Sequence, residues 1–233
     1  MNGHTPDTTL VQLQDVTKVF GVNEHSTTAV RDLSMEARRG ELLLLLGPSG
    51  SGKTTLLTLV AGLLRPTRGF VRVFGRQLES FTPAQLQSLR AGRVGYIFQT
   101  FLLIDALTVS ENVEIVLTFA RRSRSNAVLE AKQALERLQI GHLASRFPSH
   151  LSQGEKQRVA IARAIATGAE LILADEPTAS LETRQGQEII QLLHRQAKDE
   201  HRCIIVASHD LRLVEASDRV LTLEDGRVVS PPN

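Results

Sequence analysis

The chain has 233 residues, of which 42% are hydrophobic and 4% aromatic, so it can bury a full core made mainly of aliphatic side chains. Its 27 basic and 25 acidic residues leave a net charge of +2, which is too balanced to indicate a nucleic-acid-binding protein. The one basic cluster, residues 121–124, is typical of a solvated loop, with a phosphate or a lipid headgroup as the alternative contact.

Cysteine usage and hydropathy indicate a protein of a reducing compartment. The single cysteine, Cys203, lies in an apolar run, which predicts a buried thiol and excludes an intramolecular disulfide. The polar residues 1–6 lack the apolar core of a signal peptide, and no apolar stretch approaches the roughly 20 residues that span a bilayer. We therefore expect a cytoplasmic protein that reaches a membrane only through a partner.

Strands and helices alternate over the first hundred residues. The predicted elements are a disordered lead (1–9), an edge strand (10–20), an antiparallel strand (31–38), a buried strand (41–46), a helix (55–63), a strand (69–74), a helix from residue 83 and a central strand (94–98). Thr82 and Pro83 suit the N-cap and the first position of the second helix.

Residues 100–150 differ in character, because segments 107–120 and 126–139 both have helical period. The alternating pattern then resumes with a helix (154–167), a strand (171–174), a helix (183–198), a strand (203–207), a helix (210–216) and a hairpin of two strands (219–223 and 227–229). We predict one α/β domain over 1–233, with a mainly parallel sheet and an antiparallel β edge. Its core would comprise 1–99 and 151–229, with a helical subdomain inserted over about 100–150.

The most informative segment is Gly47–Thr54, Gly-Pro-Ser-Gly-Ser-Gly-Lys-Thr, which fits the phosphate-binding loop known as Walker A. Its glycines let successive backbone N–H groups turn inward around phosphates. Lys53 would bring a charge to the β- and γ-phosphates, and Thr54 a hydroxyl ligand for Mg²⁺. The buried strand before it and the helix after it favour this interpretation over a plain glycine turn. We predict that the chain binds a nucleoside triphosphate.

A second motif is an apolar strand that ends in two acids, Asp175 and Glu176. The carboxyl end of a parallel strand is where ligands bind in α/β folds. Asp175 can hold Mg²⁺, directly or through water, and Glu176 can accept a proton from an attacking water. Behind a phosphate-binding loop, this pair predicts a catalytic centre.

The third motif is segment 151–158, Leu-Ser-Gln-Gly-Glu-Lys-Gln-Arg. Locally it is a helix start, because Ser152 and Glu155 have the spacing of a capping box. Gly154 opens the backbone at the same helix end, where amides could hold a phosphate.

With the two other motifs in the same order, this segment resembles the Leu-Ser-Gly-Gly-Gln/Glu signature of ATP-binding cassette (ABC) proteins, and residues 157–164 match that family's continuation residue for residue. The resemblance covers roughly residues 10–229. It implies that Gln99 contacts the nucleotide and the metal, that Phe20 stacks on adenine where Tyr is usual, and that His209 contacts the γ-phosphate and the catalytic water.

The resemblance thus implies a full set of site residues. The catalytic ones are Glu176, His209 and Lys53. The nucleotide-binding ones are Phe20, Gly47, Pro48, Ser49, Gly50, Ser51, Gly52, Lys53, Thr54, Thr55, Gln99, Ser152, Gly154 and Asp175. The metal ligands are Thr54, Gln99 and Asp175.

Two positions depart from the family pattern. Gln153 stands where the signature usually has glycine, which narrows backbone freedom but leaves Gly154 in place. Glu182 stands where the family usually has an aspartate that helps communication across a dimer. We expect weaker coupling between the two sites of a dimer rather than loss of ATP binding.

The resemblance also implies partners. Two copies would face head to tail, with each ATP and its Mg²⁺ between the phosphate-binding loop of one copy and the signature of the other, and the homodimer would drive an integral-membrane permease from the inner face of the membrane. Segments 98–103 and 107–113 resemble the ATPases of the lipoprotein-release, macrolide-export and cell-division group. Segment 101–104 is our candidate docking surface, with packing inside the helical subdomain as the alternative.

Two other functions remain open on the sequence. One is the ATPase of a small-solute importer, and the other is a soluble ATPase that acts on nucleic acid or ribosomes. We favour the membrane motor, because the chain has a single cassette and a neutral charge balance. In that arrangement the ATPase contacts neither nucleic acid nor the transported substrate.

Overall fold

The computed structural model describes residues 8–21 and 25–229. Of the predicted disordered lead, residues 1–7 lie outside the described residues, and Thr9 already belongs to a strand. The strands are β1 (Thr9–Phe20), β2 (Thr27–Arg38), β3 (Leu42–Leu46), β4 (Arg68–Val73), β5 (Arg76–Gln77), β6 (Val94–Ile97), β7 (Leu171–Asp175), β8 (Cys203–Ser208), β9 (Arg219–Glu224) and β10 (Arg227–Val229). The α-helices are α1 (Lys53–Val60), α2 (Pro83–Arg93), α3 (Val109–Phe119), α4 (Arg124–Arg137), α5 (Gln153–Ile165) and α6 (Thr183–Asp199).

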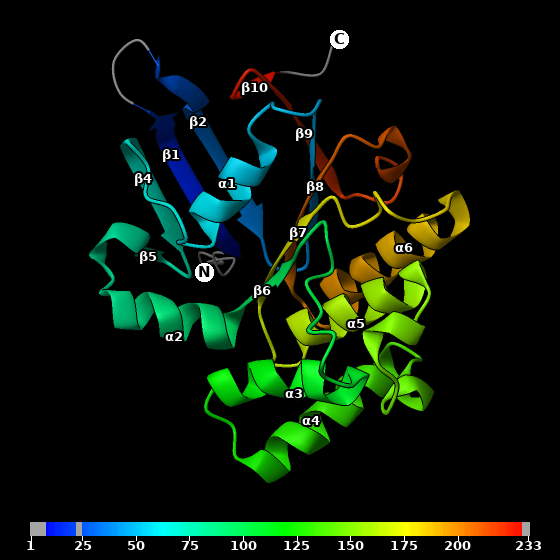
Figure 1. Ribbon diagram of the computed structural model, residues 1–233. Helices are drawn as coiled ribbons and strands as arrows, with labels where there is room; N and C mark the ends of the chain where they lie inside the picture. Colours follow the sequence, from blue (N-terminus) through cyan, green and yellow to red (C-terminus); the bar gives the residue numbers. More distant parts are fainter. Residues whose placement is uncertain (1–7, 22–24, 230–233) are drawn as a thin grey trace, which may run out of the picture.

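The strands form two sheets, with α1 between them (Figure 1). One sheet is antiparallel, with the order β2-β1-β4-β5. The other has the order β10-β9-β3-β8-β7-β6 and is parallel apart from β10. The predicted α/β class, with a mainly parallel sheet and an antiparallel part, is therefore confirmed.

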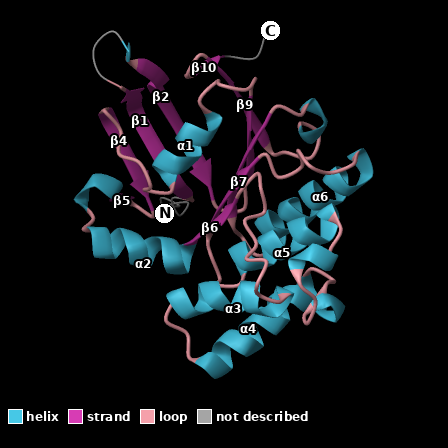
Figure 2. Cartoon of the chain, in the orientation of Figure 1, coloured by secondary structure: helices cyan, strands magenta, loops and turns pink. Residues whose placement is uncertain are grey.

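Alternate residues of β3 divide the interior into two cores. Leu43 and Leu45 face α1 and the antiparallel sheet, whereas Leu42 and Leu44 face the helices of the other side. Because both faces are covered, β3 is a continuous apolar run rather than an alternating one. Figure 2 shows α3, α4, α5 and α6 gathered on that other side, where α3 and α4 pack on each other and on α5.

Three predictions about individual elements are wrong. The strand beginning at Thr9 is not an edge strand, because β2 and β4 flank it; its alternation records one covered face and says nothing about neighbours. The strand 94–97 is not central, because it stands at one end of the sheet order and, among the described residues, pairs with β7 alone; its apolar side chains are explained by packing against α2 and α5. Residues 211–213 form one 3₁₀ turn rather than a helix over 210–216. There the Asp210 carboxylate accepts the Arg212 backbone N–H at 3.0 Å, a local bond that competes with the helix.

Other local predictions are confirmed. Thr82 is the N-cap of α2, a capping box begins α5 at Ser152, Cys203 is fully buried, and residues 121–124 are exposed. Within the described residues, no helix has the length and hydrophobicity needed to cross a membrane.

Candidate active site

The phosphate-binding loop connects β3 to α1, and its backbone requires glycine. Gly50 and Gly52 have φ values of +83° and +101°, which side-chain-bearing residues rarely adopt. A Cβ on Gly52 would lie 2.2 Å from the Ala29 carbonyl oxygen, so the loop presses directly on the antiparallel sheet. No side chain caps the start of α1, which leaves its first N–H groups and the positive end of its dipole facing the loop.

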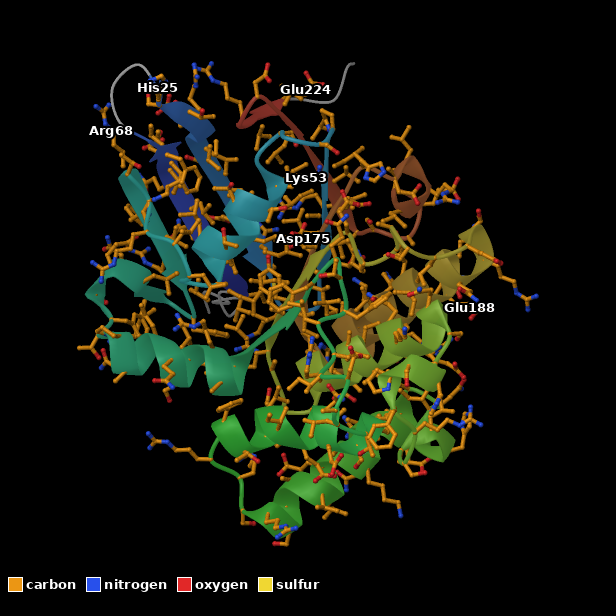
Figure 3. All side chains as sticks on the ribbon, in the orientation of Figure 1. His25, Lys53, Arg68, Asp175, Glu188 and Glu224 are labelled. Atoms are coloured by element: carbon orange, nitrogen blue, oxygen red, sulfur yellow. The ribbon has the colours of Figure 1, made fainter. Side chains whose placement is uncertain are left out.

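Lys53 lies under this loop and is only 6% exposed. Its Nζ donates to the carbonyl oxygens of Gly47 (2.7 Å) and Pro48 (2.9 Å) and lies 3.8 Å from Glu176 Oε1. In Figure 3, Lys53 and Asp175 are near each other at the centre of the molecule, where α1 begins and β7 ends. The loop carbonyls thus hold the buried Lys53 ammonium in place, and its positive charge would add to the attraction of the loop for phosphate.

Thr54 and Asp175 form the oxygen pair expected of a magnesium site. Thr54 Oγ1 donates to Asp175 Oδ1 at 3.1 Å, which ties α1 to the end of β7. Burial raises the pKa of Asp175; the Thr54 hydrogen bond and the Lys53 charge oppose this, and the neighbouring Glu176 charge adds to it. Hydroxyl and carboxylate oxygens suit Mg²⁺, which takes few protein ligands and relies on phosphates and water for the rest. The described residues contain no cluster of three His, Cys, Asp or Glu side chains that could hold a metal ion.

Glu176 is fixed from its backbone and from both carboxylate oxygens. Its φ is +47°, in the left-handed region, and its N–H donates to the Ala207 carbonyl at 2.8 Å. Ser208 Oγ donates to Oε2 at 3.0 Å, and His209 Nδ1 lies 3.0 Å from Oε1. A strained non-glycine residue that its surroundings hold in place is typical of functional sites.

Lys53, Thr54, Glu176 and His209 face one cleft of about 330 Å³. It is lined by Ala29, Ser49, Gly50, Gly52, Lys53, Thr54, Thr55, Gln99, Glu176 and His209. Gly47, Pro48, Ser51 and Asp175 do not line the cleft; they belong to the loop and the strand beneath it.

Sequence reasoning missed two residues of this site. Ala29 comes from the antiparallel sheet, and an alanine within a strand gives no signal for such a role. Ser208 could have been found, because it is the polar residue that ends an apolar strand and directly precedes His209.

Three further predicted nucleotide ligands do not line the cleft, and they belong neither to the loop nor to the strand beneath it. Phe20 ends β1 and is 41% exposed, with Lys18 Nζ 5.1 Å from its ring centroid. Ser152 and Gly154 begin α5, apart from the start of α1 (Figure 1). Ser152 is exposed, and its Oγ lies 2.8 Å from Glu155 Oε2 within the capping box.

Comparison with known proteins decides the family. A family model described as ABC transporter matches residues 30–179, which is more than half of the chain. The chain belongs to the ABC transporter family. It is an ATP-binding cassette, and its activity is ATP hydrolysis.

The relatives resemble it over nearly its whole length. It is 36% identical over 223 residues to the ABC transporter ATP-binding protein MJ0796 of Methanocaldococcus jannaschii, covering 94% of this chain and 95% of that protein. It is 37% identical over 221 residues to the macrolide export ATP-binding/permease protein MacB of Agrobacterium fabrum, covering 95% of this chain but 34% of that protein. The chain therefore spans about a third of the length of its macrolide-export relatives.

Solved structures agree with the fold. A dimeric structure of MJ0796 in a post-hydrolysis state, bound to ADP and Pi, has a TM-score of 0.87 and 34% identity to this chain, covering 95% of this chain and 97% of that one. The cbiO1 cassette of Clostridium perfringens, part of the complex cbiONQ, has a TM-score of 0.86 and 27% identity, covering 96% and 88% of the two chains.

Proposed function

We propose that this cassette hydrolyses ATP in the cleft at the start of α1, as one of two copies that close around two ATP and drive a membrane permease. The observation that carries the proposal is the convergence of Lys53, Thr54, Asp175 and Glu176, which two separate elements bring within hydrogen-bond or ion-pair reach of one another. On this proposal the chain divides into an α/β core over 1–99 and 151–229 and a helical subdomain over about 100–150.

Each residue would have a distinct role. The loop amides and Lys53 would hold the β- and γ-phosphates. Glu176 would accept the proton of the attacking water, and His209, 3.0 Å from the same carboxylate, would hold that water and the γ-phosphate. Thr54, Asp175 and Gln99 would hold Mg²⁺, which neutralises charge on the phosphate oxygens when it is bound.

The second copy would complete the site. Ser152 and Gly154 are remote from the cleft of their own chain, and they stand at an exposed helix start that suits an anion. The dimeric structure of the relative MJ0796 supports a dimer for this chain as well. Phe20 is exposed at the end of β1, where it would be free to stack on adenine.

Segment 101–104 is our proposed docking surface for the permease. Leu102 and Ile104 are 54% and 43% exposed, and they line a largely apolar hollow of about 390 Å³ together with Phe119 of α3. The macrolide-export relatives, which carry an ATP-binding and a permease part in one chain by name, support such a partner.

The backbone of this surface is held by two side chains. Arg163 of α5 donates to the carbonyl oxygens of Phe101 and Leu102, and Asn112 of α3 accepts the Ile104 N–H at 2.8 Å. With the backbone anchored inward, Leu102 adopts a φ of +49° and exposes its side chain. Exposed apolar side chains on a fixed, strained segment are typical of a binding surface.

The test is a pull-down of tagged Glu176→Gln protein with Mg²⁺ and ATP from detergent-solubilised membranes of its own host, with mass spectrometry. We expect Glu176→Gln to keep ATP binding, to accumulate as a dimer and to lose at least about 100-fold in turnover. It should recover a permease with few membrane helices and a large outer domain.

Leu102→Glu in the same background is the docking control, and it should abolish recovery of the permease while leaving the dimer intact. Recovery of a many-helix importer permease would replace the proposed permease class. Recovery of ribosomes or nucleic acid without any permease would contradict the membrane motor. Normal turnover of Glu176→Gln would contradict the role of Glu176.

A further inference from the structure

A chain of hydrogen bonds leads from Glu176 to the first turn of α6. Ser208 Oγ donates to Glu176 at 3.0 Å and accepts the Asp210 N–H at 3.2 Å. Arg212 binds the Asp210 carboxylate through Nε (2.8 Å) and Nη2 (2.6 Å), and its remaining Nη1 donates to Thr183 Oγ1 at 2.7 Å. The hydrogen bonds of this chain are 2.6–3.2 Å long, so they form a continuous connection between Glu176 and the first turn of α6.

Arg212 is suited to this position by the shape of its side chain. A guanidinium offers several N–H donors in a fixed fork, so it can hold a carboxylate with two of them and a second acceptor with a third. Asp210 lies one residue after His209, and the pKa of its carboxyl is lowered by the Arg212 hydrogen bonds. By binding Asp210, Arg212 therefore holds the segment 208–210, which carries Ser208 and His209, the two residues that contact the Glu176 carboxylate.

The start of α6 needs such a link. Glu182 occupies the N-cap of this helix, but its side chain makes no capping hydrogen bond. Asp, Ser and Thr have the short side chains that normally cap a helix, whereas the longer glutamate is not among the preferred residues. A cleft of about 450 Å³ lies between segments 178–181 and 208–212, and the Arg212–Thr183 bond joins the second segment to the start of α6.

We infer that Arg212 is a positioning residue for ATP hydrolysis, which holds Ser208, His209 and therefore the Glu176 carboxylate in register with the first turn of α6. The inference rests on the proposed role of Glu176 as the base. Arg212 does not line the proposed nucleotide cleft of about 330 Å³, so it should affect turnover rather than ATP binding.

The experiment compares Arg212→Met, Thr183→Val and the double variant in the full chain, with steady-state Mg²⁺-ATP hydrolysis, ATP binding and thermal unfolding as readouts. Arg212→Met should lower kcat roughly 10-fold, within the 100-fold that a misplacement of about 1 Å can cost, with KM changed less than about 2-fold. Thr183→Val should lower kcat about 3-fold, and the double variant should be no slower than Arg212→Met alone, because both remove one link. Arg212→Lys should recover only part of kcat, since an ammonium lacks the planar fork.

Arg195→Met is the matched control, since Arg195 is an exposed arginine on α6 for which the described residues provide no hydrogen bond or ion pair. It should match the unsubstituted protein in kcat and thermal unfolding. An unchanged kcat in Arg212→Met, or additive effects of Arg212→Met and Thr183→Val, would overturn the inference. So would a kcat loss that only mirrors a loss of folded protein. Normal turnover of Glu176→Gln would instead refute the proposed base and leave the Arg212 data interpretable on their own.

Discussion

The two motif-bearing helix starts of this protein are built in opposite ways. At the start of α1, Lys53 is buried and Gly52 is pressed against the Ala29 backbone. Thr54 is hydrogen-bonded to Asp175, and Lys53 is paired with Glu176. At the start of α5, Ser152 is exposed and its bonds stay within its own capping box. The first site is preorganised within one chain, whereas the second is stable without a ligand and free to approach one. The head-to-tail dimer proposed above requires this difference. Substitutions at the two helix starts can therefore test their roles separately.

The largest difference between the two helix starts should come from a glycine substitution at each of them. Gly52→Ala puts a Cβ 2.2 Å from the Ala29 carbonyl oxygen at a φ of +101°, so the loop must distort. We expect it to lower ATP affinity of the single chain at least about 10-fold, as measured by titration with a fluorescent ATP analogue. Gly154→Asp should bind the analogue normally, because a Cβ there would meet only the flexible Gln185 side chain, at 3.4 Å. It should nevertheless lose about 10-fold or more in ATPase activity, since a carboxylate at that helix start repels the γ-phosphate.

Two results would contradict the comparison between the helix starts. One is normal ATP binding by Gly52→Ala, which would mean that the loop does not form the phosphate site. The other is full ATPase activity in Gly154→Asp, which would mean that the start of α5 does not meet ATP.

Sequence reasoning worked best where backbone geometry and short motifs coincide. The octapeptide Gly47–Thr54 predicted its loop because glycine is required at defined dihedrals, and the capping box at Ser152 is a purely local pattern. The place of a strand in its sheet was not predictable in the same way, since alternation and hydrophobicity record covered faces rather than neighbours. Ala29 could not be predicted either, because only tertiary packing brings β2 against the loop.

Substitution of Asp175 should show how much the preorganised site lowers the free energy of unfolding. Because burial raises its pKa, the folded protein holds the ionised carboxylate less readily than the unfolded chain does. Its charge therefore opposes folding at pH 7, and this effect fades as the pH falls through the raised folded pKa toward about 3.9, the value of an unfolded aspartate. We expect Asp175→Asn, measured without nucleotide or Mg²⁺, to raise the free energy of unfolding at pH 7 by about 0.5–2 kcal/mol. Urea titrations at pH 4.5 should show a smaller rise in the free energy of unfolding for Asp175→Asn than at pH 7.

Thr54→Val serves as the control for Asp175→Asn, because it removes the hydroxyl partner and leaves the carboxylate in place. It should destabilise the protein at pH 7, where the ionised carboxylate loses its hydrogen bond. If Asp175→Asn were instead less stable than the unsubstituted protein at pH 7, the ionised carboxylate would be a net stabilising group, and the site would not be preorganised at the expense of stability.

The smallest effect should come from Glu182→Asp at the start of α6. Aspartate is among the preferred N-cap residues, and its shorter side chain can accept a backbone N–H of the first turn, which Glu182 does not do. We expect the free energy of unfolding to rise by about 0.5–1 kcal/mol, which corresponds to a rise of roughly 1–4 °C in Tm. The ATPase rate should also become more cooperative in ATP, because a firmly capped α6 would communicate better between two sites. Glu182→Gln keeps the length of the side chain and removes its charge, so it should raise neither Tm nor the cooperativity of the ATPase rate. A rise in Tm without any change in ATPase rate or cooperativity would assign Glu182 to helix stability alone and would leave the Arg212–Thr183 bond as the connection between α6 and Glu176.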